Sequence, residues 1–323
     1  MSYRGGISFV VPVYNGARTL DAVLCAIERE CSGRPCEILV VDDGSSDTSV
    51  AIAEARGHGV VRGDRRGAAA AINLGLRLAR HDLVCQIDQD VELETNALSF
   101  LVEALSADSS VAAVQGVYTW QPTASLWARI AGLDLAMRYR AMGVTADAVT
   151  PTDHACTGNT LYRRSALLEV GGFDEGFGYG YDNDLSYRLT GCGYRLCICG
   201  RARSVHHWRS RLFDYLRQQY GVGYGRLDLI AKHRHRVTGD RVSGIGMILH
   251  AAVATLALTL IPLGQALPAA CLVVVLLLER LVIGARAALH YRDPAALWFP
   301  LAHQNACRPK RRQGHQTRAP RCR

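Results

Sequence analysis

The first 115 residues alternate short apolar runs with longer segments in which apolar positions repeat at helical spacing. The runs ISFVVPVYN and EILVVDD are rich in β-branched residues and predict buried strands, whereas residues 17–30 and 46–56 predict helices. The alternation continues, with strands expected at GVVRGD, HDLVCQIDQD and VAAVQGVY and helices at 68–80 and 95–105. This order predicts an α/β fold, a doubly wound and mostly parallel sheet with right-handed crossovers.

The pattern changes in the last third of the chain. Residues 208–236 interleave basic and aromatic side chains, which is typical of a helix at a membrane surface, although a solvated basic helix is the alternative. Residues 245–264 carry no formal charge and residues 266–284 are nearly as apolar, so each stretch is long enough to span a bilayer. Arginines flank the two stretches and the turn between them is uncharged, which predicts a transmembrane hairpin with both ends in the cytosol rather than a buried core hairpin.

These patterns divide the chain into four parts. Residues 1–210 are expected to form the α/β domain, residues 211–243 a basic amphipathic juxtamembrane segment, residues 244–286 two transmembrane helices, and residues 287–323 a cytosolic interfacial segment and basic tail. Within the first part, residues 120–150 are either a helical insertion over the site or an ordinary packed helix. The chain enters a strand at once, with no signal peptide before it, which predicts a multi-pass protein of the plasma (inner) membrane with a cytosolic α/β domain.

The formal net charge of +8 narrows the possible partners. A positive balance suits nucleic acid, anionic lipid or a phosphorylated substrate. The sequence has no zinc-finger spacing and no RNA-binding aromatic motif, so no nucleic-acid partner is predicted.

Two adjacent carboxylates, Asp42 and Asp43, follow a buried strand in the stretch EILVVDDGSSD. Ligands of open α/β sheets bind at the carboxyl ends of the strands, and two close acids need a cation, a hydrogen-bond donor or a ligand to hold them. Either Asp alone could be a helix N-cap. As a pair, they fit a phospho-accepting receiver domain or a nucleotide-sugar site. The receiver interpretation is disfavoured because a strand precedes this one and the first lysine is Lys232.

A second acidic motif, Asp88-Gln89-Asp90, ends a later predicted strand. Residues two apart on a strand share a face, so both carboxylates are expected to approach one divalent cation, Mn²⁺ or Mg²⁺, that bridges the diphosphate of a nucleotide donor.

Together these motifs resemble the family 2 glycosyltransferases of the GT-A fold. The resemblance covers about residues 5 to 210, and its motifs are VVPVYN, VDDGSSD, RRGAAAAINLGL, DQD, GNTLYRRSALLEVGGFDE, YDNDLSYRL and VHHW. The predicted hairpin is similar to that of many membrane-bound members of this family.

The resemblance implies a role for each motif on the donor side. It places the nucleotide base and ribose at Pro12, Tyr14 and Asp42 or Asp43, a segment that closes over the donor at Arg66 to Asn73, and the metal and diphosphate at Asp88 and Asp90, with Asp90 the surer metal ligand. His206 or His207 could complete the metal shell or contact the diphosphate.

On the acceptor side, the resemblance points to Gly158 and Asn159 and to the stretch YDNDL. Asp182 matches the catalytic base of the family, whereas Tyr181 replaces a Glu that the family usually carries before it. Asp184 would support the site or cap a helix.

Elementary chemistry agrees with these roles. A single displacement at an anomeric carbon inverts it, and needs a base for the acceptor hydroxyl and a cation for the departing diphosphate, which Asp182 and Asp90 would supply. The sequence therefore predicts transfer from a nucleotide-diphospho-sugar to a glycan or lipid-linked acceptor, in contact with membrane lipids. Two alternatives remain. One is a processive polysaccharide synthase, although no Gln-x-x-Arg-Trp motif follows the base, and the other is a catalytically inactive interaction protein on the same scaffold.

Overall fold

The computed structural model describes residues 3, 5–121, 123–236 and 246–301. In these residues one nine-stranded sheet has the order β3-β2-β1-β4-β8-β6-β9-β5, with β7 beside β9. The strands are β1 (Ile7–Val13), β2 (Cys36–Asp42), β3 (Val60–Arg62), β4 (Leu83–Ile87), β5 (Val91–Leu93), β6 (Val111–Thr119), β7 (Val149–Thr152), β8 (Asn159–Arg163) and β9 (Arg195–His206). The predicted α/β fold is confirmed.

The strand directions are only partly those predicted. β3, β2, β1 and β4 run parallel, and β9 pairs in parallel with β6. β8 is antiparallel to β4 and β6, and β5 and β7 are antiparallel to β9. β7, not a crossover helix, immediately precedes β8 along the chain, so the handedness rule for βαβ units does not set the direction of β8. The sheet is therefore mixed.

Helices cover both faces of the sheet. The helices of the α/β body are α1 (Leu20–Glu30), α2 (Ser49–Ala55), α3 (Ala68–Leu78), α4 (Ala97–Ser106), α6 (Arg164–Glu169) and α7 (Tyr181–Gly191). Phe9 and Val11 of β1 belong to the core that includes α1 and α4, whereas Val10 belongs to the core that includes α3. Neighbouring residues on a strand point to opposite faces, which explains why β1 is buried along its whole length.

One edge of the sheet collects the strand ends that carry the predicted motifs. β1, β2 and β4 are parallel and end at Val13, Asp42 and Ile87. β9 has the same direction and ends at His206, and the antiparallel β8 begins at this edge, with Asn159 opposite Ile87. Segments far apart in the sequence therefore meet at one place.

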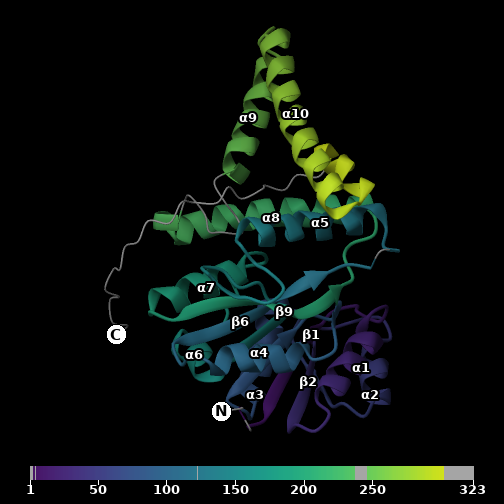
Figure 1. Cartoon of the computed structure of the whole chain (residues 1–323), viewed down its shortest axis with the longest axis vertical. Helices are drawn as coiled ribbons and strands as arrows, with labels where there is room; N and C mark the ends of the chain where they lie inside the picture. Colours follow the sequence, from purple (N-terminus) through teal and green to yellow (C-terminus); the bar gives the residue numbers. More distant parts are fainter. Residues whose placement is uncertain (1–2, 4, 122, 237–245, 302–323) are drawn as a thin grey trace.

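Helices α5 (Leu126–Ala141) and α8 (Leu212–Lys232) lie across the α/β body, and the pair α9 (Gly246–Leu260) and α10 (Ala266–Tyr291) projects away from them (Figure 1). The foot of α10 and the short helix η2 (Pro294–Leu301) pack on α5, where Ile130 and Leu133 meet Ala287 and Ala296. Residues 120–150 thus contain a helix, α5, which packs against these C-terminal helices. A short 3₁₀ turn, η1 (Arg234–Arg236), follows α8.

One helix in the described part of the chain, α10, is long and apolar enough to cross a membrane. Its most apolar stretch has a mean hydropathy of 2.4 and is 11% buried. α9 has 15 described residues, which reach about 22 Å, less than the roughly 30 Å of a bilayer core. The predicted pair of helices is present, but among the described residues α10 alone is long enough to cross a bilayer. The first predicted span begins at residue 245, and that residue and the tail from 302 lie outside the described residues.

Candidate functional site

Backbone and side-chain donors hold the adjacent acids at the end of β2. Asp42 is buried and accepts hydrogen bonds from the Ser45 N–H at 3.1 Å and from Arg62 Nη1 at 3.0 Å. Burial opposes ionisation, but these donors outweigh it and lower the pKa of Asp42. Asp43 accepts from the N–H groups of Arg66 at 3.0 Å and Gly67 at 2.7 Å, so it fixes the turn before α3.

Tyr14 and Pro12 flank the same edge from β1. Pro12 is buried inside the sheet, whereas Tyr14 is exposed just beyond it. The side chain of Gln89 accepts from the Tyr14 N–H at 2.8 Å and donates to the Tyr14 carbonyl at 3.1 Å. Arg65 donates to the Tyr14 hydroxyl at 3.1 Å. An exposed aromatic ring is therefore held next to the acidic turn of β4.

The predicted donor-closing segment contains one exposed and one buried polar side chain. Arg66 is exposed and pairs with Glu175 at 2.7 Å. Asn73 is buried, donates to the Phe173 carbonyl at 2.8 Å and accepts from the Phe173 N–H at 2.8 Å. The Asn73 side chain thus links α3 to the loop before α7 through hydrogen bonds.

The Asp88–Asp90 pair does not lie on a strand, contrary to the sequence prediction. β4 ends at Ile87, and the Val91 N–H donates to the Asp88 carbonyl at 3.0 Å, which closes a tight turn into β5. The carboxylate of Asp88 accepts from Gln86 Nε2 at 2.7 Å. The carboxylate of Asp88 also lies close to the backbone of Gly158, which has a φ of +97°. Only a glycine fits there, because a Cβ would lie 2.5 Å from Asp88 Oδ2.

The acids at this turn repel one another. Burial raises the pKa of Asp88 to about 7, the charge on Asp90 adds to this effect, and so does the charge on Asp182, while the Gln86 hydrogen bond opposes it. Asp182 comes from a different part of the chain, yet its charge acts on Asp88. The three carboxylates therefore belong to one site.

The structure separates the roles of the two adjacent histidines. His206 Nε2 lies 3.7 Å from Asp90 Oδ1, and its ring stacks on Trp208 with the centroids 3.8 Å apart. His207 Nε2 instead lies 3.3 Å from Glu92 Oε2. His206 is therefore the histidine of the acidic turn.

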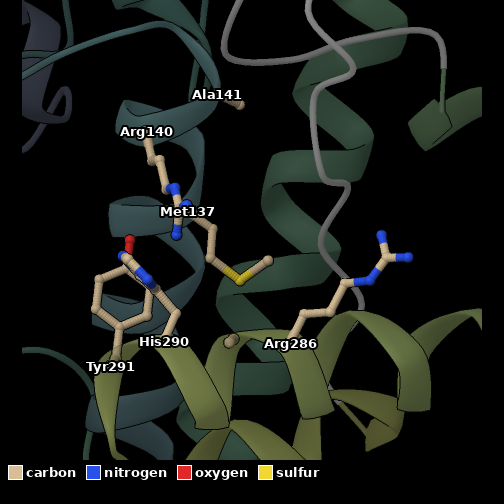
Figure 2. Close-up of a pocket in the computed structure, with 7 residues that line it drawn as sticks. Met137, Arg140, Ala141, Arg286, His290 and Tyr291 are labelled. Atoms are coloured by element: carbon tan, nitrogen blue, oxygen red, sulfur yellow. The ribbon is translucent and has the colours of Figure 1, made fainter.

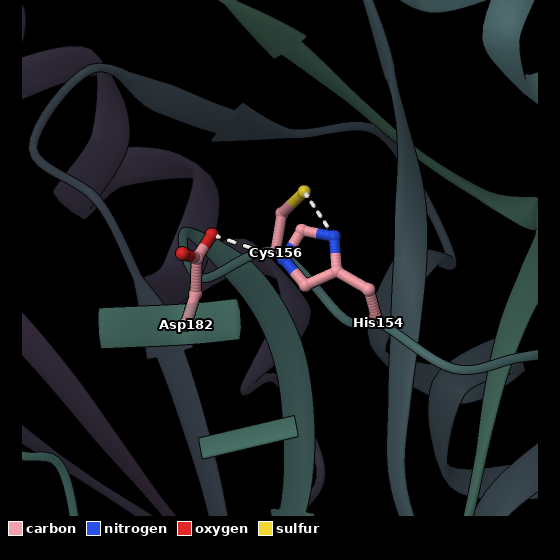
Figure 3. Close-up of side chains that lie close together, drawn as sticks. All are labelled: His154, Cys156 and Asp182. Carbon is pink, nitrogen blue, oxygen red and sulfur yellow. Dashed lines mark hydrogen bonds and ion pairs between the residues drawn. The ribbon is translucent and has the colours of Figure 1, made fainter. Parts of the chain in front are cut away.

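Asp182 lies in the first turn of α7 and is partly exposed. The N-cap of this helix is Gly180, so Asp182 is not the cap. His154 Nε2 lies 3.4 Å from Asp182 Oδ2, and His154 Nδ1 lies 4.0 Å from Cys156 Sγ (Figure 3). Burial disfavours a charged ring, but the neighbouring Cys156 and Asp182 outweigh it and raise the pKa of His154 well above its usual range.

In the described part of the chain, His154, Cys156 and Asp182 offer potential metal ligands within 4.8 Å of one another. Opposite nitrogens of the His154 ring face Cys156 and Asp182, however, and one nitrogen alone can bind a given ion. The arrangement fits a ring that bridges and orients its neighbours better than it fits a chelate.

Asp184 and Asn159 are buried side chains that bond to other elements of the fold. Asp184 is fully buried and pairs with Arg188 at 2.7 Å, with Lys232 at 2.7 Å and with His233 at 2.8 Å, which ties α7 to the end of α8. Asn159 donates to Ser204 Oγ at 2.7 Å. Both side chains act between elements of the fold.

Two of the cavities that the described residues form lie beyond the strand ends. One, of about 320 Å³, opens beside Asp182 between α5, α7 and α8 and is lined by Arg138, His154 and Arg226 among others. The other, of about 340 Å³, lies where α5 meets the foot of α10 (Figure 2). Sequence reasoning missed His154 and Arg226, because neither has a motif spacing to the residues that it meets.

Comparison with solved structures defines the class of protein. The chain is similar to the mannosyltransferase PcManGT from Pyrobaculum calidifontis, solved in complex with GDP-Man and Mn²⁺, with 24% identity and a TM-score of 0.60 over 93% of this chain and 85% of that one. The fold is thus that of the GT-A glycosyltransferases.

Sequence comparison then identifies the family. Residues 8–171 match the family model for glycosyl transferase family 2, and the chain belongs to this family. The succinoglycan biosynthesis protein ExoA of Rhizobium meliloti is 28% identical over 260 residues, 77% of this chain and 75% of its own. The pre-mycofactocin glycosyltransferase of Mycobacterium tuberculosis is 30% identical over 250 residues, 74% of this chain and 50% of its own, so the chain spans about half of that relative.

Proposed function

We propose that this glycosyltransferase moves a sugar from a nucleotide-diphospho-sugar to a hydroxyl group of a glycan or lipid-linked acceptor, with inversion at the anomeric carbon. The observation that carries this proposal is the convergence of Asp88, Asp90, His206 and Asp182, from three segments of the chain, at one edge of the sheet.

The residues at the acidic turn fit a divalent cation. Asp88 is half-buried beside the charge of Asp90, so a cation would relieve their repulsion, and carboxylate oxygens suit Mn²⁺ or Mg²⁺. Asp88, Asp90 and His206 would hold it, and the bound ion would neutralise charge on the leaving diphosphate. The complex of PcManGT with GDP-Man and Mn²⁺ supports this assignment.

The protein's own residues would bind the donor and remove the proton. Tyr14, exposed at the edge, would pack against the nucleotide base, and Asp42 and Asp43 would fix the turns around it. Asp182, turned toward His154, would accept the proton of the acceptor hydroxyl as that oxygen attacks the anomeric carbon and the carbon–diphosphate bond breaks.

The position of the acceptor is proposed from the C-terminal helices. The apolar length of α10 would anchor the protein in the plasma membrane, with the α/β body on the cytosolic face and α9 beside it in the bilayer. The relation to a succinoglycan biosynthesis protein supports a glycan acceptor built at that surface.

The adjacent histidines give a matched test. Asp90→Asn and His206→Gln should each lower Mn²⁺-dependent nucleotide release by roughly 100-fold. His207→Gln should stay near the parent rate, because His207 faces Glu92 and not the acidic turn. The measurement is nucleotide release from UDP-, GDP- and dTDP-sugars with Mn²⁺ and after chelation. Equal rates for all three variants, or full activity under chelation, would contradict the proposal that these residues bind a cation.

A further inference from the structure

The cavity of about 320 Å³ beside Asp182 has arginine side chains in its wall. Arg138 comes from α5 and Arg226 from α8, and both are buried, with Arg226 5% exposed. Asp182, the proposed base, lines the same cavity. Two guanidinium groups thus line one partly open cavity together with the proposed base.

Arg226 has no carboxylate partner among the described residues. Its Nη1 donates to the Tyr187 hydroxyl at 3.3 Å and its Nη2 to the Arg236 carbonyl at 3.2 Å, both neutral acceptors. Its Nε is buried without a partner. Arg138, in contrast, donates from Nε to Asp134 Oδ2 at 2.9 Å. Burying a cation costs free energy unless an anion lies beside it. The environment of Arg226 therefore favours a negatively charged ligand in this cavity.

We propose that this cavity binds a phosphate group carried by the acceptor, with Arg226 and Arg138 on the phosphate and the acceptor hydroxyl directed at Asp182. This inference rests on the proposed function and names the acceptor class of that same site. Guanidinium groups bind phosphate oxygens through paired, charge-assisted hydrogen bonds. The acceptor hydroxyl therefore lies close to a phosphate in the acceptor molecule.

Helix α8 indicates where the phosphate comes from. Its inner face lines the cavity, whereas Phe213, Tyr220 and Leu227 on the same helix are 82%, 75% and 64% exposed. An exposed row of aromatic and aliphatic side chains beside an apolar helix pair suits the surface of a bilayer. The phosphate of a prenyl-phosphate-linked acceptor, which sits at that surface, is the expected ligand.

The test uses the full chain in detergent micelles with EDTA and without donor, so that the proposed cation site does not contribute. Farnesyl phosphate should bind at least roughly 10-fold more tightly than farnesol, and Arg226→Gln should abolish this preference. Arg226→Lys should keep part of it. Arg217→Gln is the matched control, because Arg217 is an exposed arginine of the same helix, and it should bind like the parent.

Two further arms keep the test decisive. Glucose 1-phosphate that binds as tightly as farnesyl phosphate would assign the phosphate to a soluble acceptor, and weaker binding would assign it to a lipid. If Arg226→Gln does not fold, millimolar inorganic phosphate should displace farnesyl phosphate from the parent protein, while chloride at equal ionic strength should not. Equal affinity for farnesol, or an unchanged preference in Arg226→Gln, overturns the proposal. Since no turnover is measured, that result would leave the metal-dependent transfer chemistry untouched.

Discussion

At the scale of single residues, the two acids of the YDNDL stretch have opposite environments. Asp182 is partly exposed to the cavity, whereas Asp184 is fully buried among Arg188, Lys232 and His233. Spacing in the sequence makes them look alike. The sequence could identify the motif, but it could not show that His233, 49 residues later, and the end of α8 contact Asp184. These contacts separate the acid available for chemistry from the acid that stabilises the fold.

His154 is expected to act on the rate through Asp182 as a positioning residue. His154→Gln should lower kcat by roughly 10- to 100-fold, because the carboxylate loses the ring that orients it, while the KM of the donor stays constant. The pH–rate profile should shift as well, because the His154 ring, whose pKa Cys156 and Asp182 raise, no longer lies beside the base. Cys156→Ala, which keeps the ring against Asp182, is the control. A change in donor KM without a shift of the pH profile would indicate a structural role only.

Asp184 is expected to matter for stability. Asp184→Asn removes the carboxylate that Arg188 and His233 contact and one of the two that Lys232 contacts, and should lower the free energy of unfolding by about 3–5 kcal/mol, measured by denaturant unfolding. Burial opposes ionisation of Asp184, but Lys232, His233 and Arg188 outweigh it and lower its pKa in the folded protein. Its contribution is therefore complete above about pH 4 and is lost as the pH falls through the lower folded-state pKa. A variant as stable as the parent at pH 7 would refute this assignment.

At the scale of elements, glycines allow helix α8 to pack closely against the loop before α7. A Cβ at Gly225 would lie 2.5 Å from the Tyr179 carbonyl oxygen, and one at Gly221 would lie 2.3 Å from the Tyr179 ring. Gly223, on the outer side of the helix, has nothing within 4 Å. The stretch QQYGVGYGR thus lets the helix rest directly on the loop before α7, a contact that the sequence alone did not reveal because the loop is distant along the chain.

The glycines of α8 give a second matched pair. Gly225→Ala should push α8 away from the loop and destabilise the protein, because the obstructing atom is backbone and cannot rotate aside. Gly223→Ala should stabilise it by up to about 1 kcal/mol, as expected for Gly→Ala in an open helix position. Thermal unfolding of both variants checks this. Similar shifts for the two variants would contradict the close contact at Gly225.

At the scale of the whole molecule, apolar periodicity was enough to predict the α/β body and the helix pair. It could not predict that β8 runs antiparallel, because strand direction depends on the connection and not on the composition of the strand. It also misplaced Asp88 and Asp90 on a strand, since a tight turn and a strand end look alike in a short acidic motif. Residues that meet across elements, such as Arg226 and Tyr187, carry no local signal.

Membrane attachment through α10 is expected to respond to a charge in its middle. Val274→Glu, at a half-exposed position of α10, should reduce the carbonate-resistant membrane fraction, since an acid near the bilayer centre costs about 3 kcal/mol. Leu289→Glu, close to the end of the same helix, should have little effect. If both variants fractionate like the parent, α10 does not enter the bilayer.

The direct contact between Gly225 and the Tyr179 carbonyl also constrains how such enzymes can diverge. At Gly225, the loop before the helix that carries Asp182 rests on the backbone of α8, so neither partner can grow alone there. A related chain that carries a larger residue at the position of Gly225 must route the loop before its base differently, and its acceptor cavity must change shape with it. Substitutions in the two segments should therefore be inherited together, and a new acceptor specificity should arise from paired changes in the loop and the helix.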